Sequence, residues 1–333
     1  MAAPAPAGAG APARPSCLGL PPADLPAGGL HPALLDPWEA ALAMGAGVVL
    51  ALLTKTEGPA YREIGAALAI DARGGYAGAI TSGCIEADLV LHAAEVRTSG
   101  VPRVLRYGAG SPFFDLKLPC GGALEVTLVP VGAGERLRAL ARARAERRAV
   151  SLHLAPSGAL TLGAFAETGP EAEGFRVGFR PALRHLILGA GPEALAFARL
   201  VAGLGREHLL LSHDDMVLGS ARALGLSARR LGAIAELETV GVDAETAVTL
   251  FYHDHDMEPE LLRALLAHPA AYIGAQGSRA AQVARVARLG ALGVAPEAIA
   301  RLRGPIGLIP STRDPETLAI SVLAEISAVV ARR

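Results

Sequence analysis

Cysteine is scarce in this sequence, and so are aromatic residues. Three cysteines occur in 333 residues, an odd number without the regular spacing of a disulfide framework. This excludes a small secreted scaffold held together by disulfides and favours a reducing compartment. Phe, Trp and Tyr make up only 4% of the chain, while hydrophobic residues reach 51%. We therefore expect Ala- and Leu-rich helices packed on sheets.

An excess of charge of either sign is also missing. The chain has 31 Lys and Arg against 32 Asp and Glu, a formal net charge of −1, and without a long basic run nothing indicates nucleic acid as a partner. We find no apolar run of about 18 residues free of charge or glycine, so no membrane span is expected. The sequence predicts a soluble, cytoplasmic protein.

The length suggests two domains rather than one. Residues 1–30 are rich in Ala, Pro and Gly and carry one cysteine, Cys17, and we interpret them as a disordered leader. Residues 31–168 are expected to form an N-terminal α+β domain. A Gly- and Glu-rich link follows at 168–174, and a doubly wound α/β domain is expected over 180–333.

The N-terminal domain combines buried β runs with three helices, one of which carries Cys84. An arginine and two glycines, Arg73-Gly74-Gly75, separate two strands as a hairpin turn. We expect strands at 48–53, 66–71, 76–80, 103–107 and 123–129, short strands at 150–154 and 160–165, and helices at 34–44 and 134–148.

Cys84 stands where a β run ends and an amphipathic helix is expected to begin. Ser82 is predicted to cap this helix, which places Gly83 and Cys84 at its start. Because the first turn of a helix favours negative charge, a thiol there is biased toward thiolate, the form that attacks sulfur and binds soft metals. Glu86 could oppose that bias or shuttle a proton.

Cys120 is the second candidate thiol. It lies between a proline and two glycines, Gly121 and Gly122, so backbone or ligand can approach it closely. The simpler alternative applies to both thiols, since a free cysteine is more often a small buried hydrophobe than a reactive group.

The second half contains a dinucleotide fingerprint. A strand at 184–188 runs into Gly189, Gly191 and Ala194 with the G-x-G-x-x-A spacing, which predicts a tight turn that receives a pyrophosphate at a helix N-terminus. Asp214 follows the next strand, 25 residues after Gly189, and is a candidate ligand for a ribose hydroxyl. Pro192 removes one backbone N–H from the anion site.

Two later loops complete the candidates. His253 and His255, flanked by Asp254 and Asp256, follow a strand and could hold a metal ion, although a polar loop that caps the next helix is the more common explanation. Ser278 and Arg279 begin a further helix, where they could face an anion.

These motifs together resemble the XdhC/CoxI family of accessory factors for xanthine dehydrogenase and related molybdenum hydroxylases. The resemblance runs from residue 48 to the C-terminus. It rests on Thr-Lys-Thr-Glu-Gly at 54–58, Ser-Gly-Cys-Ile-Glu-Ala-Asp at 82–88, Leu-Pro-Cys-Gly-Gly at 118–122, Leu-Gly-Ala-Gly at 188–191, His-Asp-His-Asp at 253–256, Gly-Ser-Arg at 277–279 and Gly-Pro-Ile-Gly-Leu at 304–308.

The resemblance implies an N-terminal XdhC domain followed by a Rossmann domain. It also implies a chaperone rather than a turnover enzyme: one that binds molybdenum cofactor (molybdopterin), supports its sulfuration and delivers it to an apo molybdenum hydroxylase. Cys84 and Cys120 would hold the cofactor or handle its sulfur. The implied partners are the hydroxylase, a cysteine desulfurase and a second copy of the chain as a homodimer.

Two other functions stay open on the sequence. The glycine turn and Asp214 are also typical of an NAD(P)-dependent oxidoreductase, for which His213, His253 or His255 would be the proton donor. The other is a structural or regulatory binding module that uses its Rossmann half only for association with a partner.

Overall fold

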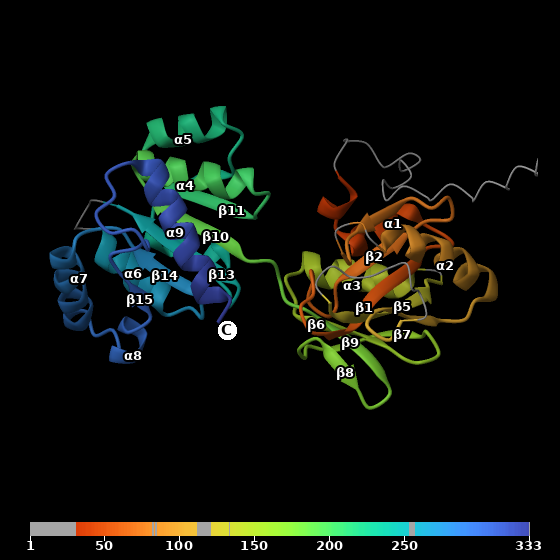
Figure 1. The fold of residues 1–333 in the computed structure, drawn as a ribbon. Coiled ribbons are helices and arrows are strands. Elements are labelled where there is room, and N and C mark those ends of the chain that lie inside the picture. Colours follow the sequence, from red (N-terminus) through yellow and green to blue (C-terminus); the bar gives the residue numbers. More distant parts are fainter. Residues whose placement is uncertain are drawn as a thin grey trace, which may run out of the picture. The chain divides into compact units, whose positions relative to one another are not determined.

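The computed structural model describes residues 31–81, 83, 85–111, 121–132, 134–252 and 257–332. The chain divides into two compact units, one ending at Arg180 and the other beginning at Pro181 (Figure 1). We call them the N-terminal unit and the Rossmann unit. The expected fold class is confirmed: the first unit has antiparallel sheets, and the second has a parallel one.

A five-stranded antiparallel sheet is the centre of the N-terminal unit, in the order β3-β2-β1-β5-β4. Side chains alternate between its two faces, as a strand period of two requires. Val49, Ala51 and Leu53 of β1 face a core that helix α2 covers, and Leu50 and Leu52 face the opposite core. The strands are β1 (Val49–Glu57), β2 (Ala67–Ile70), β3 (Tyr76–Gly78), β4 (Arg103–Gly108) and β5 (Ala123–Pro130).

Helix α2 (Glu86–Ser99) covers the first face with the residues that the sequence pattern predicted: Ile85 at its N-cap, and Leu89, Ala93 and Val96, are all buried. The other face packs against helices and a second sheet of order β7-β6-β9-β8. These elements are η1 (Pro32–Leu34), α1 (Pro37–Met44), α3 (Glu135–Ala145), β6 (Val150–Leu154), β7 (Leu160–Ala164), β8 (Gly169–Glu171) and β9 (Gly174–Phe179).

The segment expected to be a link, 168–174, is instead part of the second sheet. Strands β8 and β9 pair antiparallel, and β9 also pairs with β6. The reason lies in Phe175 and Val177, whose buried side chains belong to the core beneath the first sheet. Thr168 also takes part, since its hydroxyl accepts a hydrogen bond from the Gly178 N–H at 3.0 Å.

The Rossmann unit is a six-stranded parallel sheet in the order β12-β11-β10-β13-β14-β15. This is the strand order 3-2-1-4-5-6 of dinucleotide-binding folds, and it reverses between β10 and β13. The strands are β10 (Arg184–Gly189), β11 (His208–Ser212), β12 (Ala228–Arg230), β13 (Thr246–Phe251), β14 (Tyr272–Ala275) and β15 (Leu302–Arg303).

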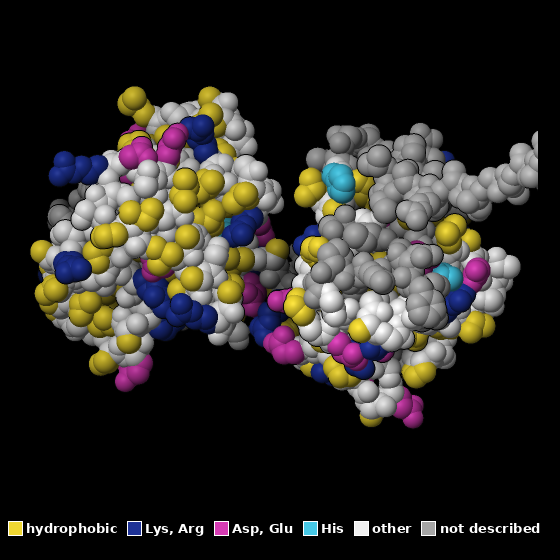
Figure 2. All heavy atoms as spheres, in the orientation of Figure 1, with side chains coloured by type: hydrophobic (Ala, Val, Ile, Leu, Met, Phe, Trp, Pro, Cys, Tyr) yellow, Lys and Arg dark blue, Asp and Glu magenta, His cyan; other side chains and the backbone are white. Residues whose placement is uncertain are grey.

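Helices cover both faces of this sheet, each with its own apolar core. One face packs against α4 (Pro192–Gly203), α5 (Asp215–Ala223) and α9 (Pro315–Val330). The other packs against η2 (Ile234–Val240), α6 (Glu258–Leu266), α7 (Arg279–Ala291) and α8 (Pro296–Ile299). Figure 2 shows apolar side chains gathered on the surface over α4 and α9; the exposed ones on these helices and their ends include Leu204 and Ile320.

Across the described ranges, no helix is long and apolar enough to cross a membrane.

Candidate functional site

The loop that leads into α2 is held by one buried carboxylate, that of Glu86. Its side chain is only 3% exposed. One oxygen, Oε1, accepts from the Ile80 N–H at 3.1 Å and the Thr81 N–H at 2.6 Å. The other, Oε2, accepts from the Thr81 hydroxyl at 2.6 Å, the Gly83 N–H at 3.1 Å and the Ile85 N–H at 3.3 Å. Five donors satisfy the buried charge, as burial of a carboxylate requires.

Helix α2 begins at Glu86 with Ile85 as its N-cap, and none of the described side chains caps it. The prediction that Ser82 caps the helix and that its first turn contains position 84 is therefore wrong. The physical reason is that Glu86 Oε2 already accepts from the Ile85 N–H, a group that a cap at position 82 would satisfy. Cys84 itself lies outside the described residues.

Glu86 was predicted to oppose the thiolate or to shuttle a proton. In the structure both of its oxygens are occupied by loop donors, an arrangement that suits a residue that shapes a loop. Gly83, on the other side of Cys84, is exposed and has a φ of +107°, and an added Cβ would have no described atom within 4 Å. A left-handed turn of this kind favours glycine.

A second contact ties the start of α2 to the end of β4. The buried Tyr107 donates its hydroxyl to Asp88 Oδ2 at 2.6 Å. Burial, and then the Asp88 carboxylate, raise the pKa of Tyr107, so the phenol stays protonated as a donor. The loop before α2 is thereby anchored near the last residues of β4.

Gly121 and Gly122, which follow Cys120, lie beside the same strand end. Gly108 pairs with Ala123 at the start of β5, and the Ala109 N–H donates to the Gly122 carbonyl at 3.3 Å. A Cβ on Gly122 would lie 2.7 Å from the Glu57 carbonyl oxygen and 2.8 Å from that of Pro59. Only glycine fits this close backbone approach, as the sequence suggested. Cys120 lies outside the described residues.

The segments that flank both cysteines thus meet at one end of the five-stranded sheet. Strands β1 and β4 finish there and β5 begins there, because both neighbours of β5 are antiparallel to it. We call this the β1/β4 end. It is also where the Thr-Lys-Thr-Glu-Gly motif at 54–58 completes β1.

Charges at the β1/β4 end form a closed network. Arg106 on β4 binds Glu57 Oε2 at 2.7 Å and Glu125 Oε1 at 2.9 Å. Lys55 Nζ lies 2.9 Å from Glu57 Oε1. The hydrogen bonds from Arg106 and Lys55 lower the pKa of Glu57 to about 2. No local pattern marked Arg106 and Glu125 as partners of β1, because they meet that strand only through sheet pairing.

The glycine turn of the Rossmann unit packs as the fingerprint predicted. A Cβ on Gly189 would lie 2.6 Å from the Ala194 Cβ and 3.0 Å from the Phe251 Cβ, so this glycine allows the helix to contact the strand. Gly191 is the N-cap of α4. A Cβ there would lie 2.8 Å from Glu193 Oε2. The carboxylate therefore lies against the turn that would receive a pyrophosphate, and opposes an anion there.

Asp214 is the N-cap of α5, and its Oδ1 accepts from the Met216 N–H at 2.7 Å and the Val217 N–H at 3.4 Å. The preceding residue, His213, stacks on the buried Tyr252 with ring centroids 5.4 Å apart. His213 follows β11 and Tyr252 follows β13, so the stack bridges the two strands on either side of β10. Ribose binding by Asp214 stays a prediction.

The remaining candidate site residues belong to two other loops of the Rossmann unit. Ser278 caps α7, its hydroxyl accepting from the Ala281 N–H at 3.1 Å, and Arg279 is exposed at the first position of that helix. His253 and His255 lie outside the described residues. Within the ranges that the structure covers, no three His, Cys, Asp or Glu side chains could hold a metal ion together.

Sequence reasoning missed a buried ion pair in the Rossmann unit. Arg285 of α7 donates Nε–H to Glu258 Oε1 of α6 at 2.6 Å, and its Nη2 donates to the Gln276 carbonyl at 2.8 Å. Both charged side chains are almost fully buried. No local pattern marks such a pair, since its members are 27 positions apart.

Comparison with known proteins defines the class. Residues 41–108 match the model of the XdhC and CoxI family, and residues 186–326 match that of the XdhC Rossmann domain. The chain is 36% identical over 87% of its length, and 85% of the relative's, to a protein of Escherichia coli (strain K12). It belongs to the XdhC and CoxI family.

That relative is named molybdenum cofactor insertion chaperone PaoD. A second protein of Escherichia coli (strain K12), the uncharacterized protein YqeB, is 31% identical over 45% of this chain and 27% of its own length. A crystal structure from Bacillus halodurans, described as a xanthine dehydrogenase, has the same fold with a TM-score of 0.70 at 22% identity. That match covers 89% of this chain and 95% of the other.

Proposed function

We propose that this protein is a molybdenum cofactor chaperone: it binds the cofactor and passes it to an apo molybdenum enzyme. The carrying observation is the convergence at the β1/β4 end of the segments that flank Cys84 and Cys120, joined by the Tyr107–Asp88 hydrogen bond and the β4–β5 pairing. The name of the relative that matches over most of both chains supports the same function.

Cys84 and Cys120 are the proposed ligands for the cargo. Thiolates are soft ligands and suit molybdenum and sulfur chemistry. Gly83 beside one thiol and Gly121 beside the other leave the backbone uncrowded, since an added Cβ at either would have no described atom within 4 Å, while Gly122 lies close to the Glu57 and Pro59 carbonyl oxygens. We therefore propose that the three glycines beside these cysteines, Gly83, Gly121 and Gly122, line the cargo site at the β1/β4 end.

The finer steps are part of the proposal. While the cofactor is held, a cysteine desulfurase supplies its terminal sulfur, and the client is a hydroxylase of the xanthine dehydrogenase type. Both partners are implied by the resemblance to the family and are proposals for this chain. A homodimer, in the cytoplasm, is the proposed assembly.

The test is cofactor retention. Anaerobically purified full-length protein is incubated with molybdenum cofactor and desalted, and molybdenum and pterin are measured per chain. Wild type is compared with Cys84→Ser and Cys120→Ser, and Cys17→Ser is the matched control for removal of a thiol. We expect near-stoichiometric retention in wild type and Cys17→Ser and a clear loss in Cys84→Ser, Cys120→Ser or both. Equal retention in all four proteins would show that the thiols do not hold the cofactor. No retention in wild type would show that the proposed function is wrong.

The structure gives less support to an NAD(P)-dependent oxidoreductase. The strand order and Gly189 suit a nucleotide. However, Pro192 lacks an N–H and Glu193 places a carboxylate at Gly191, and both weaken the anion site. Calorimetry with NADH and NADPH tests this alternative directly, and saturable binding of either would favour it.

A further inference from the structure

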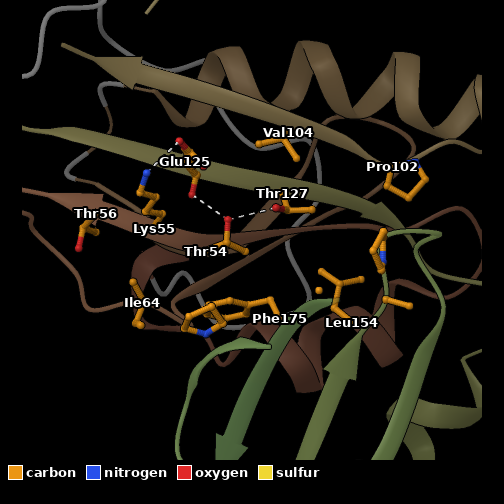
Figure 3. A pocket seen from close by; sticks show the side chains of 14 residues that line it. Thr54, Lys55, Thr56, Ile64, Pro102, Val104, Glu125, Thr127, Leu154 and Phe175 are labelled. Carbon is orange, nitrogen blue, oxygen red and sulfur yellow. Dashed lines mark hydrogen bonds and ion pairs between the residues drawn. The ribbon is translucent and has the colours of Figure 1, made fainter. Parts of the chain in front are cut away.

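The N-terminal unit contains a cavity of about 690 Å³ between its two sheets (Figure 3). One wall is formed by β1 and β5, and the other by the ends of β6 and β9. Its apolar lining includes Ile64, Pro102, Val104, Leu154 and Phe175. The volume lies within the range of about 300–1,000 Å³ that small-molecule and cofactor sites occupy.

Among the described lining residues, the polar side chains lie on the side formed by β1 and β5. The Thr54 hydroxyl lies 3.1 Å from the Thr127 hydroxyl and 3.3 Å from the Glu125 carbonyl oxygen. This contact exists because the pairing of β1 with β5 shifts register between Leu53 and Lys55, which frees Thr54 from the regular ladder. A hydroxyl both donates and accepts, so this pair retains hydrogen-bonding capacity toward a ligand.

The Glu125 carboxylate completes the polar side. Its contacts with Arg106 at 2.9 Å and Lys55 at 3.8 Å both use Oε1. Together with Glu57, these residues make two cations and two carboxylates, so no charge of one sign dominates. A neutral ring with N–H donors suits such a wall better than a phosphate does, because an N–H donates to a carboxylate oxygen whereas the carboxylate repels a phosphate.

The cavity adjoins the β1/β4 end of the sheet. Thr54, Lys55 and Thr56 line the cavity, and the next residue of β1, Glu57, has its carbonyl oxygen against Gly122. A ligand whose ring lies in the cavity can therefore extend along β1 toward the segment that follows Cys120.

We propose that this cavity holds the pterin of the cargo, a fused amino-pyrimidinone ring, with its edge on Glu125, Thr54 and Thr127 and its faces against the apolar walls. This inference rests on the proposed function. It adds the position of the ring and separates it from the thiols, which are proposed to hold the metal end.

The test uses neopterin, a fluorescent free pterin, titrated into the full-length protein. Val104→Trp places a large ring at the cavity: Val104 is 61% exposed on the edge strand β4, so the core is not disturbed. Val101→Trp is the matched control, since Val101 is 62% exposed and does not line the cavity. Thr127→Val removes one hydroxyl of the polar side.

We expect saturable binding to wild type and to Val101→Trp. Val104→Trp should weaken it on the order of tenfold or more, and Thr127→Val by about fivefold, the usual effect of one hydrogen bond. Equal affinity for wild type and Val104→Trp overturns the proposed position, and so does the absence of saturable binding.

Cofactor retention in the same variants separates this inference from the proposed function. If wild type and Val104→Trp retain molybdenum cofactor equally, the cavity is not the pterin site and the chaperone function stands. If wild type does not retain the cofactor but binds neopterin with the expected sensitivity to Val104→Trp, the cavity binds pterins and the chaperone function fails.

Discussion

Gly83 and Glu86 are joined by a hydrogen bond of 3.1 Å from the Gly83 N–H to Glu86 Oε2, and the same oxygen also accepts from the Ile85 N–H. One carboxylate oxygen therefore fixes the backbone on both sides of position 84. The conformation of this loop depends on an acid that is itself nearly inaccessible to solvent.

Replacement of Glu86 by Gln should loosen this loop. The amide keeps one acceptor oxygen but turns an NH₂ group toward backbone donors, which leaves buried N–H groups unsatisfied at about 1–3 kcal/mol each. We expect faster hydrogen exchange at the amides of Thr81, Gly83 and Ile85, and altered alkylation kinetics of Cys84. Glu95→Gln, on the exposed side of the same helix, is the control. Unchanged exchange in Glu86→Gln would show that the carboxylate does not hold the loop.

The buried Glu258–Arg285 pair makes a prediction for the Rossmann unit. Arg285→Met leaves an uncompensated buried carboxylate and should destabilise this unit by roughly 3–5 kcal/mol. The double change Glu258→Leu with Arg285→Met should recover much of that loss, since it removes both charges. Arg263→Ala breaks the exposed pair with Glu260 and should cost about 1 kcal/mol or less. The stability of the Rossmann unit in all three variants is measured by chemical denaturation, followed by hydrogen exchange of the amides in that unit. A double variant that is no more stable than Arg285→Met contradicts this prediction.

His185 makes the stability of the Rossmann unit sensitive to pH. It is fully buried in β10, and neither ring nitrogen has a hydrogen-bond partner among the described residues. Burial, and then the nearby Arg206 and His208, lower its pKa from 6.5 to about 4. The unfolded chain therefore binds a proton that the folded chain excludes as the pH falls from about 6.5 to about 4.

The expected loss of stability over that interval is on the order of 3 kcal/mol, from about 1.4 kcal/mol per pKa unit. His185→Leu removes the titrating group and should flatten this part of the pH profile. The measurement is the unfolding midpoint of both proteins between pH 4 and pH 7. Parallel profiles would show that His185 does not titrate differently on folding.

Gly189 and Gly219 should respond oppositely to alanine. Gly189→Ala places a methyl group 2.6 Å from the Ala194 Cβ and should cost roughly 1–3 kcal/mol through overpacking. Gly219 lies within α5, and no described atom lies within 4 Å of an added Cβ, so Gly219→Ala should stabilise by up to about 1 kcal/mol. Thermal unfolding compares the two. A stable Gly189→Ala would mean that the helix can shift away from the strand.

Local signals were sufficient for much of the fold. The G-x-G-x-x-A spacing after a β run predicted β10 and α4, and the 3.6-residue period of Ile85, Leu89, Ala93 and Val96 predicted the buried face of α2. Such signals depend on residues a few positions apart. They failed where a contact with a more distant residue competed. The predicted cap at position 82 was wrong because the Glu86 carboxylate accepts from the Ile85 N–H. The predicted link at 168–174 is part of a sheet because Phe175 packs in the core.

By itself the sequence determined the glycine turn and the positions of the two cysteine motifs along the chain, because hydrophobic periodicity and turn chemistry are local properties. Only the tertiary structure decided that β1, β4, β5 and α2 bring the flanks of both motifs to one end of a sheet. It alone also decided that Thr54 meets Thr127 over a cavity and that Glu258 meets Arg285. These relationships join residues 27 to 73 positions apart, and chain topology and packing, rather than neighbouring residues, determine them.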